Sequence, residues 1–101
     1  MIRFSIVTIT YNAEECLQRT LDSVWEQTYQ YVEHIIVDGN STDESVAIIK
    51  DYARNIEEKS LHLALKWISE PDNGIYNAMN KGIRMATGDY VQILNSGDIL
   101  A

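Results

Sequence analysis

The hydrophobic positions of the chain switch between two periods, and each switch marks a new element. Residues 4–10 and 32–38 are short runs rich in β-branched apolar side chains, which is typical of strands covered on both faces. Residues 13–27 and 43–55 instead place their apolar side chains on one helical face. The first half of the chain therefore predicts two consecutive strand–helix units.

The second half of the chain continues this alternation. Residues 55–60 are polar and predict a loop, and residues 63–70 alternate apolar with polar side chains, which indicates a strand at an edge of the sheet. Apolar positions over residues 75–86 fall on one face of a third helix, and Gly88 stands where a left-handed residue would end it. Residues 89–94 then predict a fourth strand.

The regular alternation of strands and helices predicts the fold class. It favours a parallel sheet with right-handed crossovers and helices on both faces. A mononucleotide-binding half of a Rossmann fold has the strand order 3-2-1-4. We therefore predict one α/β domain over residues 1–101, with a Rossmann-like, three-layer αβα architecture and a mostly parallel sheet. In such sheets, ligands bind where the carboxyl ends of the strands meet, at the point where the strand order reverses.

Polar residues at the first two helix starts predict local caps. Asn12 and Glu15 have the three-residue spacing of a capping box. Ser41 and Glu44 repeat that spacing before the second helix. Gly39, between the second strand and Ser41, allows the chain to turn where a side chain would clash. Both helices are therefore expected to begin at these capping boxes.

The charge of the chain narrows the classes of ligand. There are 15 acidic and 8 basic residues, which give a formal net charge of −7. This balance disfavours nucleic acid, because nucleic-acid-binding proteins present a basic surface. An acidic domain can still hold a phosphate group through helix N-termini, or through a divalent metal bound by carboxylates.

The cysteine content and the apolar runs predict the compartment. Cys16 is the only cysteine, so no internal disulfide can form and a reducing, cytoplasmic location is expected. No apolar run is long enough to span a bilayer. Met1 leads directly into the first strand without a secretory signal. We therefore expect no membrane segment in this chain.

Several common site motifs are missing. The loop Thr10–Ala13 has no glycine, so the dinucleotide fingerprint is absent, and no P-loop occurs. No histidine and cysteine cluster has the spacing of a zinc site. His34 and His62 each stand alone in or near a strand, and we interpret both as strand or surface residues rather than functional groups.

Asp38 follows the buried second strand and is the first candidate ligand-binding residue. An ionised carboxylate only accepts hydrogen bonds, so Asp38 could bind a ribose hydroxyl or the imide N–H of a pyrimidine base. It could equally cap the following turn, as Asp often does. Tyr11 follows the first strand, where its ring could stack on a base or simply pack over the loop.

Two later segments contain the remaining candidates. Asp72 opens the third helix and is explained more simply as a turn and N-cap residue. Asn80 lies on the polar face of that helix, although Asn is a mediocre helix former. The loop from Asn95 to Asp98 offers a carboxylate at a strand end, which could hold Mg²⁺ or Mn²⁺ together with phosphate oxygens and water. That loop could also be an ordinary polar turn.

Five segments follow one another in the order of a known family: Ser5–Asn12, Leu21–Tyr29, Ile36–Asp43, Ser69–Gly82 and Ala86–Tyr90. Together they resemble the family 2 glycosyltransferases over the whole chain. The resemblance implies the GT-A fold, a nucleotide-diphosphate sugar as donor, Mg²⁺ or Mn²⁺ as cofactor, and inversion of the anomeric centre. It also suggests bacterial polysaccharide biosynthesis, with a uridine diphosphate sugar as the favoured donor.

Carried over by position, the resemblance implies a set of site residues. Asp38 would accept a hydrogen bond from uracil or a related base. Asp98 would be the metal ligand, at the end of an Asp-x-Asp-type loop. The nucleotide-sugar site would comprise Thr10, Tyr11, Asn12, Asp38, Asp72, Asn80 and Asn95. No catalytic residue is assigned within the chain.

Two departures from the family pattern change what we expect of this chain. Gly97 stands where the metal loop commonly has an aspartate, so one carboxylate is lost. In the family, the acceptor half and the catalytic base follow the metal loop, whereas this sequence ends at Ala101. We therefore expect a truncated, donor-binding portion that does not transfer sugar by itself.

An alternative is a non-catalytic nucleotide-binding or assembly module that keeps the same fold. Gly97 and the short chain favour this reading. Metal-dependent binding of uridine diphosphate that is lost on Asp98→Ala would support the enzyme lineage instead. In either case the sheet edge beside the fourth strand would be uncovered, so self-association through that edge is expected.

Overall fold

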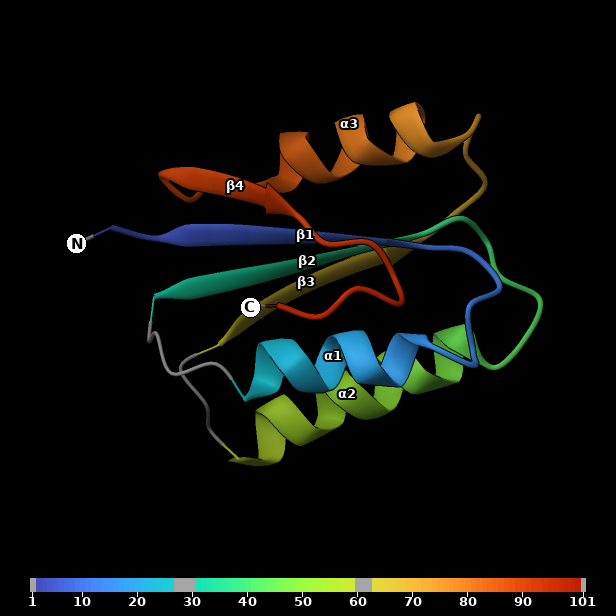
Figure 1. The fold of residues 1–101 in the computed structure, drawn as a ribbon, viewed down its shortest axis with the longest axis horizontal. Coiled ribbons are helices and arrows are strands. Elements are labelled where there is room, and N and C mark those ends of the chain that lie inside the picture. The colour runs from blue at the N-terminus through green and yellow to red at the C-terminus, as the bar shows by residue number, and fades with distance from the viewer. Residues whose placement is uncertain (1, 27–30, 60–62, 101) are drawn as a thin grey trace.

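The computed structural model describes residues 2–26, 31–59 and 63–100. Its helices and strands follow the predicted order (Figure 1). No helix within these ranges is long and apolar enough to cross a membrane. The elements are β1 (Phe4–Thr10), α1 (Leu17–Trp25), β2 (Val32–Asp38), α2 (Ser45–Lys59), β3 (Ala64–Ser69), α3 (Ile75–Met85) and β4 (Tyr90–Ile93).

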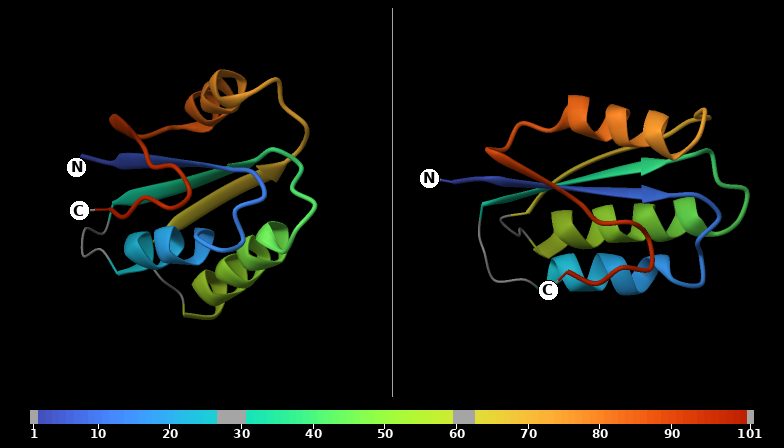
Figure 2. Two further views of the ribbon diagram at one scale, coloured as in Figure 1. Left: turned by 45° about the vertical axis from the view of Figure 1, so that its right-hand side comes forward. Right: turned by 45° about the horizontal axis from the view of Figure 1, so that its top comes forward.

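The strands are parallel and lie in the order β3-β2-β1-β4, as predicted. β1 and β2 have the predicted bounds, because both are continuous runs of apolar and β-branched side chains. α3 covers one face of the sheet, and α1 and α2 cover the other, which gives three layers (Figures 1 and 2). At the carboxyl ends of the strands, Asp38 pairs with Thr10 on one side and with Ser69 on the other.

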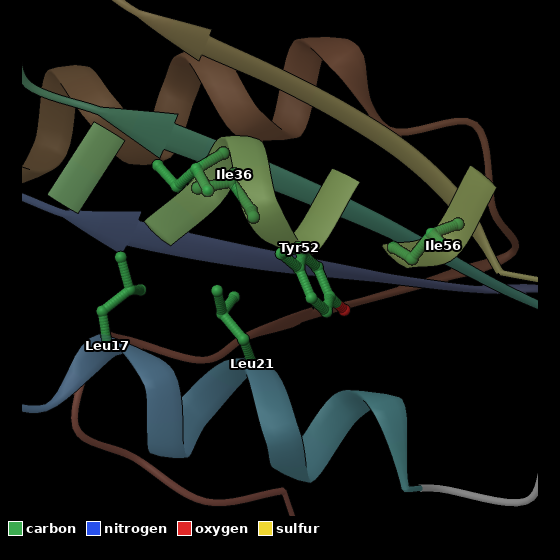
Figure 3. Close-up of a cluster of buried hydrophobic side chains, with 6 residues drawn as sticks. Leu17, Leu21, Ile36, Tyr52 and Ile56 are labelled. Atoms are coloured by element: carbon green, nitrogen blue, oxygen red, sulfur yellow. The ribbon is translucent and has the colours of Figure 1, made fainter. Parts of the chain in front are cut away.

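The core lies on both faces of β2, whose seven residues are all buried. On the face covered by α3, Val7, Ile35 and Val37 pack against Ala78. The opposite face packs against α1 and α2, and each helix directs one apolar stripe toward the sheet, as its period predicts. The buried side chains of that layer are Leu17, Leu21, Ile36, Ile49, Tyr52 and Ile56 (Figure 3).

Gly82 and Gly88 are needed for close packing. A Cβ added to Gly82 would collide with Cγ1 of Val7, so α3 can approach the sheet this closely only with glycine there. The prediction that Gly88 ends the third helix is wrong, because α3 already ends at Met85. Instead, a Cβ added to Gly88 would lie 2.8 Å from the carbonyl oxygen of Arg3.

Both predicted capping boxes are wrong, because their polar residues bond across the fold instead. α1 begins at Leu17 rather than directly after Asn12. Asn12 has a left-handed φ of 46°, and its side-chain oxygen accepts the backbone N–H of Thr42 at 2.8 Å. Oγ of Ser41 accepts the backbone N–H of Asn12 at 2.9 Å, while its hydroxyl donates to Asp38, three residues earlier. Tertiary hydrogen bonds therefore replace the local caps at these two positions.

α2 begins at Ser45, and Asp43 caps it by accepting the backbone N–H of Ser45 at 2.9 Å. Burial would raise the pKa of Asp43, but hydrogen bonds, chiefly from Ser45, outweigh it and lower the pKa. α2 continues through Lys59, so the predicted loop over residues 55–60 is wrong for its described part. Residue 60 lies outside the described residues, as does Gln27, the predicted end of the first helix.

His34 is buried inside the layer formed by α1, α2 and the sheet. Its ring nitrogens lie 2.8 Å from Oγ1 of Thr8 and 2.9 Å from the hydroxyl oxygen of Tyr52. Burial lowers the pKa of His34 to about 3, so the ring is neutral near pH 7. Of the two interpretations of His34, a strand or a surface residue, the structure shows the strand residue. His62 lies outside the described residues.

Glu33 is buried on the opposite face of β2, which the sequence pattern does not indicate. Its Oε1 lies 2.7 Å from Nζ of Lys66, and its carboxylate accepts hydrogen bonds from Ser5 and Thr87. Burial alone would raise the pKa of Glu33, but these partners outweigh it and hold the pKa at about 2. One carboxylate therefore joins β1, β2, β3 and the segment between α3 and β4.

β4 is an edge strand with little cover, as the predicted topology requires. Tyr90 and Val91 are 58% and 44% exposed. The ring of Phe4 stacks on that of Tyr90, with 5.6 Å between the centroids. Self-association through this edge stays a prediction.

Candidate functional site

The loops that follow the four strands lie together at one end of the sheet (Figure 2). We call this end the carboxyl rim, which consists of residues 10–13, 38–43, 69–74 and 94–98. It includes the point where the strand order reverses, between β1 and β4. Backbone hydrogen bonds join neighbouring parts of the rim: Gly39 N to Thr10 O, Glu70 N to Asp38 O, and Ser96 N to Ile9 O.

Asp38 lies at the centre of the rim and is fully buried. Its Oδ2 accepts the backbone N–H of Ser41 at 2.8 Å and the hydroxyl of Ser69 at 2.7 Å, and its Oδ1 accepts the hydroxyl of Ser41. The carboxylate therefore fixes the loop after β2 to the end of β3. The sequence left Asp38 two roles, as a cap of the following turn or as a ligand of a ribose or base. The structure shows the turn cap, and contact with a ribose or base stays a prediction.

Thr10 and Asn95 each contribute a buried oxygen that has no hydrogen-bond partner among the described residues. These are Oγ1 of Thr10, which belongs to a side chain adjacent to Asp38 in the sheet, and the side-chain Oδ1 of Asn95. Buried polar atoms normally have a partner. Two unpaired oxygens on the carboxyl rim are therefore groups to which a ligand or water could bond.

The loop after β1 is held against the loop after β2. The backbone N–H of Asn12 donates to Oγ of Ser41 at 2.9 Å, and that of Ala13 donates to Oγ of Ser45 at 3.0 Å. Asn12 in turn accepts from Thr42, as described above. Asn12 therefore connects two loops of the carboxyl rim, and its predicted contact with a nucleotide sugar stays a prediction.

Tyr11 and Asp72 come from different loops, and both side chains lie against Gly39. Tyr11 is 61% exposed, so one part of its ring is open to solvent. Oδ1 of Asp72 accepts the backbone N–H of Gly74 at 3.0 Å, just before α3. Asp72 thus closes a turn, as predicted, but the predicted N-cap role is wrong, because Gly74 is the N-cap of α3 and has no side-chain cap. Asn80 is exposed on α3, and no hydrogen bond joins it to the other candidates within the described ranges.

The loop from Asn95 to Asp98 bends toward α1 (Figure 1). The backbone N–H of Gly97 donates to Oγ1 of Thr20 at 2.7 Å, and that of Leu100 donates to Oγ of Ser23 at 3.0 Å. Asp98 is exposed, and its Oδ2 accepts the backbone N–H of Asn95 at 3.2 Å. The structure therefore places Asp98 on the rim, on the side that faces α1.

The residues of this loop offer a divalent metal a small set of ligands. Within the part of the chain that the structure describes, no three acidic, histidine or cysteine side chains are grouped to hold a metal. Gly97 has a left-handed φ of 98°, which an aspartate rarely adopts. Asp98 is then the one carboxylate of the loop. Mg²⁺ is commonly held by one or two carboxylates plus phosphate oxygens and water, so the loop fits a metal that a diphosphate also binds.

Residues 5–101 match the sequence model of glycosyl transferase family 2. The chain belongs to this family. Its parallel sheet with the order β3-β2-β1-β4 and the helices on both faces form part of a GT-A fold, as predicted.

Curated relatives are named as glycosyltransferases and are longer than this chain. An uncharacterized glycosyltransferase of Mycobacterium tuberculosis is 43% identical over 95 residues, which cover 93% of this chain and 33% of the relative. A PGL/p-HBAD biosynthesis glycosyltransferase of Mycobacterium tuberculosis is 38% identical over 98 residues, which cover 96% of this chain and 36% of the relative. The chain therefore spans about a third of the length of these relatives.

Solved structures of similar fold contain nucleotide sugars. A mannosyltransferase from Pyrobaculum calidifontis, in complex with GDP-Man and Mn²⁺, superposes with a TM-score of 0.87 at 29% identity and covers 97% of this chain and 28% of its own. S. aureus TarS, in complex with UDP-GlcNAc, superposes with a TM-score of 0.79 at 26% identity and covers 97% of this chain and 27% of its own.

The sequence alone does not reveal the Ser and Thr residues whose hydrogen bonds hold the candidate site residues in place. Ser69 and Ser41 bond to Asp38, and Thr20 and Ser23 hold the loop after β4. Their signal in the sequence is weak, because Ser and Thr are common in helices and at strand ends alike. The order of the strands gives the better clue, since it brings Ser69 next to Asp38.

Proposed function

We propose that this chain is the nucleotide-diphosphate-sugar-binding portion of an inverting, metal-dependent glycosyltransferase. The observation that carries the proposal is the match of its fold, at a TM-score of 0.87, to a mannosyltransferase in complex with GDP-Man and Mn²⁺. The gathering of four strand-end loops at the carboxyl rim supports it, because open α/β sheets bind ligands there. A uridine diphosphate sugar is the favoured donor.

In this proposal, different residues of the carboxyl rim contact different parts of the nucleotide sugar. The exposed ring of Tyr11 offers a stacking surface for the base. The buried carboxylate of Asp38 holds the loop after β2 in place. The unpaired oxygens of Thr10 and Asn95 are acceptors for the nucleotide or for water bound with it, and Asn12 and Asn80 border the site.

Asp98 is the residue that would hold Mg²⁺ or Mn²⁺, shared with the diphosphate. When bound, the metal neutralises charge on the departing nucleoside diphosphate. The reaction itself is a displacement: an acceptor oxygen forms a bond to the anomeric carbon, the bond to the diphosphate breaks, and the acceptor proton passes to a base. We assign no residue of this chain as that base, so we propose that the chain alone does not transfer sugar.

Isothermal titration calorimetry with UDP and GDP tests this proposal, each with and without Mn²⁺. We expect one nucleotide to bind, more tightly when Mn²⁺ is present, and Asp98→Ala to remove the effect of the metal. Asp51→Ala is the matched control, because it removes an exposed carboxylate from α2, away from the rim. Failure of both nucleotides to bind, with and without metal, would contradict the proposal.

The second candidate function is a nucleotide-binding or assembly module without catalysis. The single carboxylate of the loop after β4 favours it, since no acidic cluster for a metal exists within the described ranges. This candidate predicts nucleotide binding that Mn²⁺ leaves unchanged.

We further propose a cytoplasmic location and a part in bacterial polysaccharide biosynthesis. We also propose self-association through the sheet edge at β4. Light scattering at increasing protein concentration tests the self-association.

A further inference from the structure

Gly39 is the point where two other loops of the carboxyl rim converge. A Cβ added to Gly39 would lie 2.9 Å from Oδ2 of Asp72 and 3.2 Å from Cδ1 of Tyr11. Real Cβ atoms essentially never approach another atom to under 3.0 Å. The carboxylate of Asp72 therefore occupies space that a side chain at position 39 would need.

The glycine at this position is required for space and not for backbone conformation. The residues of the chain with left-handed φ values are Asn12, Asn40, Gly74 and Gly97 within the described ranges, so Gly39 is not among them. Alanine can adopt the backbone conformation of position 39. Because the closest atom is the end of a flexible side chain, an alanine there would displace the Asp72 carboxylate without distorting the main chain.

The two carboxylates near Gly39 differ in their capacity to bind a ligand. Asp38 is fully buried and accepts three hydrogen bonds from the chain. Asp72 is half-buried, and its Oδ1 accepts the backbone N–H of Gly74. Its Oδ2 accepts no hydrogen bond within the described residues and lies over Gly39 beside the ring of Tyr11. Asp72, rather than Asp38, has a carboxylate oxygen free to accept from a ligand.

We propose that Asp72 is the residue that reads the base of the nucleotide, and that Gly39 is the specificity-determining position that makes room for it. This inference rests on the proposed function. In this proposal, a base stacked on the exposed ring of Tyr11 has its edge within reach of Oδ2 of Asp72, because that ring and that oxygen both lie against the same face of Gly39. Uracil and guanine both present a ring N–H at that edge, and the carboxylate accepts it as a charge-assisted hydrogen bond. Asp38 is then a positioning residue for the loop after β2.

A double-mutant cycle with methylated nucleotides tests this inference. UDP and GDP are titrated into the chain, and the one that binds is compared with its analogue methylated at the ring nitrogen, N3-methyl-UDP or N1-methyl-GDP. The wild-type chain is expected to bind the methylated analogue at least about tenfold more weakly, because a hydrogen bond to a charged group is lost. Asp72→Ala and Gly39→Ala are each expected to abolish this discrimination.

The double variant separates a direct role of Gly39 from one exerted through Asp72. If the alanine at position 39 acts by displacing the carboxylate, then Gly39→Ala adds no further loss of affinity in the Asp72→Ala background. Asp51→Asn, on the exposed face of α2, is the control for a change of charge. Full discrimination retained by Asp72→Ala, or additive losses in the double variant, would overturn the inference.

An NMR measurement without nucleotide keeps this result distinct from a failure of the proposed function. The backbone N–H of Gly74 reports on Asp72, because it donates to Oδ1 at 3.0 Å. Gly39→Ala is expected to shift the Gly74 amide resonance, and an unchanged resonance would show that position 39 does not control Asp72. If the wild-type chain binds neither nucleotide, the proposed function and the base-reading role both fail, while the Gly74 resonance still decides whether Gly39 positions Asp72.

Discussion

Asp38 and Glu33 are both buried acidic side chains of β2, but they lie at opposite ends of the strand and meet different partners. Asp38 accepts hydrogen bonds only from neutral groups, those of Ser41 and Ser69. Glu33 faces the cation of Lys66 together with neutral donors. A buried carboxylate therefore does not by itself mark a binding site. What distinguishes the Asp38 end is its surroundings, where the end of β1 and the loops after β1 and β4 carry two oxygens without a partner among the described residues and one exposed aromatic ring.

We expect the largest effect in acid, where the free energy of unfolding should fall. The cause is two buried side chains of β2, His34 and Glu33, which bind protons more readily in the unfolded chain. Unfolded histidine binds a proton near pH 6.5, whereas the folded pKa of His34 is about 3, so stability is complete above pH 6.5 and falls as the pH drops toward 3. This loss is on the order of 4 kcal/mol. Glu33 adds a loss in the same direction as the pH falls from 4.5 toward 2.

Urea denaturation followed by circular dichroism, repeated between pH 8 and pH 3, measures this dependence. Glu33→Gln is the matched variant, because it should remove the contribution of Glu33 below pH 4.5 and retain the loss from His34, which continues from pH 6.5 toward pH 3. A free energy of unfolding that stays constant from pH 7 to pH 4 would show that His34 is not buried in its neutral form.

Glu33→Ala should have the next largest effect on stability. It should also show that the Glu33 end of the sheet affects stability without affecting nucleotide binding. The substitution removes the acceptor for Lys66, Ser5 and Thr87, so the free energy of unfolding is expected to fall by about 3 kcal/mol. Nucleotide affinity of the folded fraction should not change, because Glu33 lies away from the carboxyl rim. A weaker nucleotide affinity at equal folded concentration would contradict the division into two ends.

Asp38→Asn should have a smaller effect on stability but should weaken binding. The amide group replaces one acceptor oxygen with a donor and cannot accept from Ser41 and Ser69 as the carboxylate does. The expected cost is about 1 to 2 kcal/mol of unfolding free energy, with a fall in nucleotide affinity as the loop after β2 loosens. Denaturation and calorimetry on the same preparation measure both. Unchanged affinity would mean that the Asp38 end does not support the site.

The sequence predicted the fold well because its signals are local. The apolar runs of β1 and β2 and the helical period of α3 determine the elements, and their order determines the sheet. The helix starts were predicted poorly because their polar residues found distant partners. Asn12 accepts from Thr42, and Ser41 accepts from the backbone N–H of Asn12, and no local pattern distinguishes such bonds from a cap.

The placement of the candidate residues in the fold was predictable, but their hydrogen-bond partners were not. Strand order alone placed Asp38 beside Thr10 and Ser69, at the carboxyl end of the sheet, where open α/β sheets commonly bind ligands. Which carboxylate remains free to meet a ligand depends on partners that come together only in the fold. Glu33 illustrates the same limit, because a charge within a strand becomes buried only when a distant residue such as Lys66 pairs with it.

The central claim, that the carboxyl rim binds a nucleoside diphosphate, is tested most directly by an NMR titration of the chain with UDP and GDP in the presence of Mg²⁺. We predict that one nucleotide shifts the amide resonances of residues 38–42, 72–74 and 95–98, while those of Glu33 and Thr87 stay in place. Shifts confined to the Glu33 end, or none at saturating nucleotide, would contradict the account.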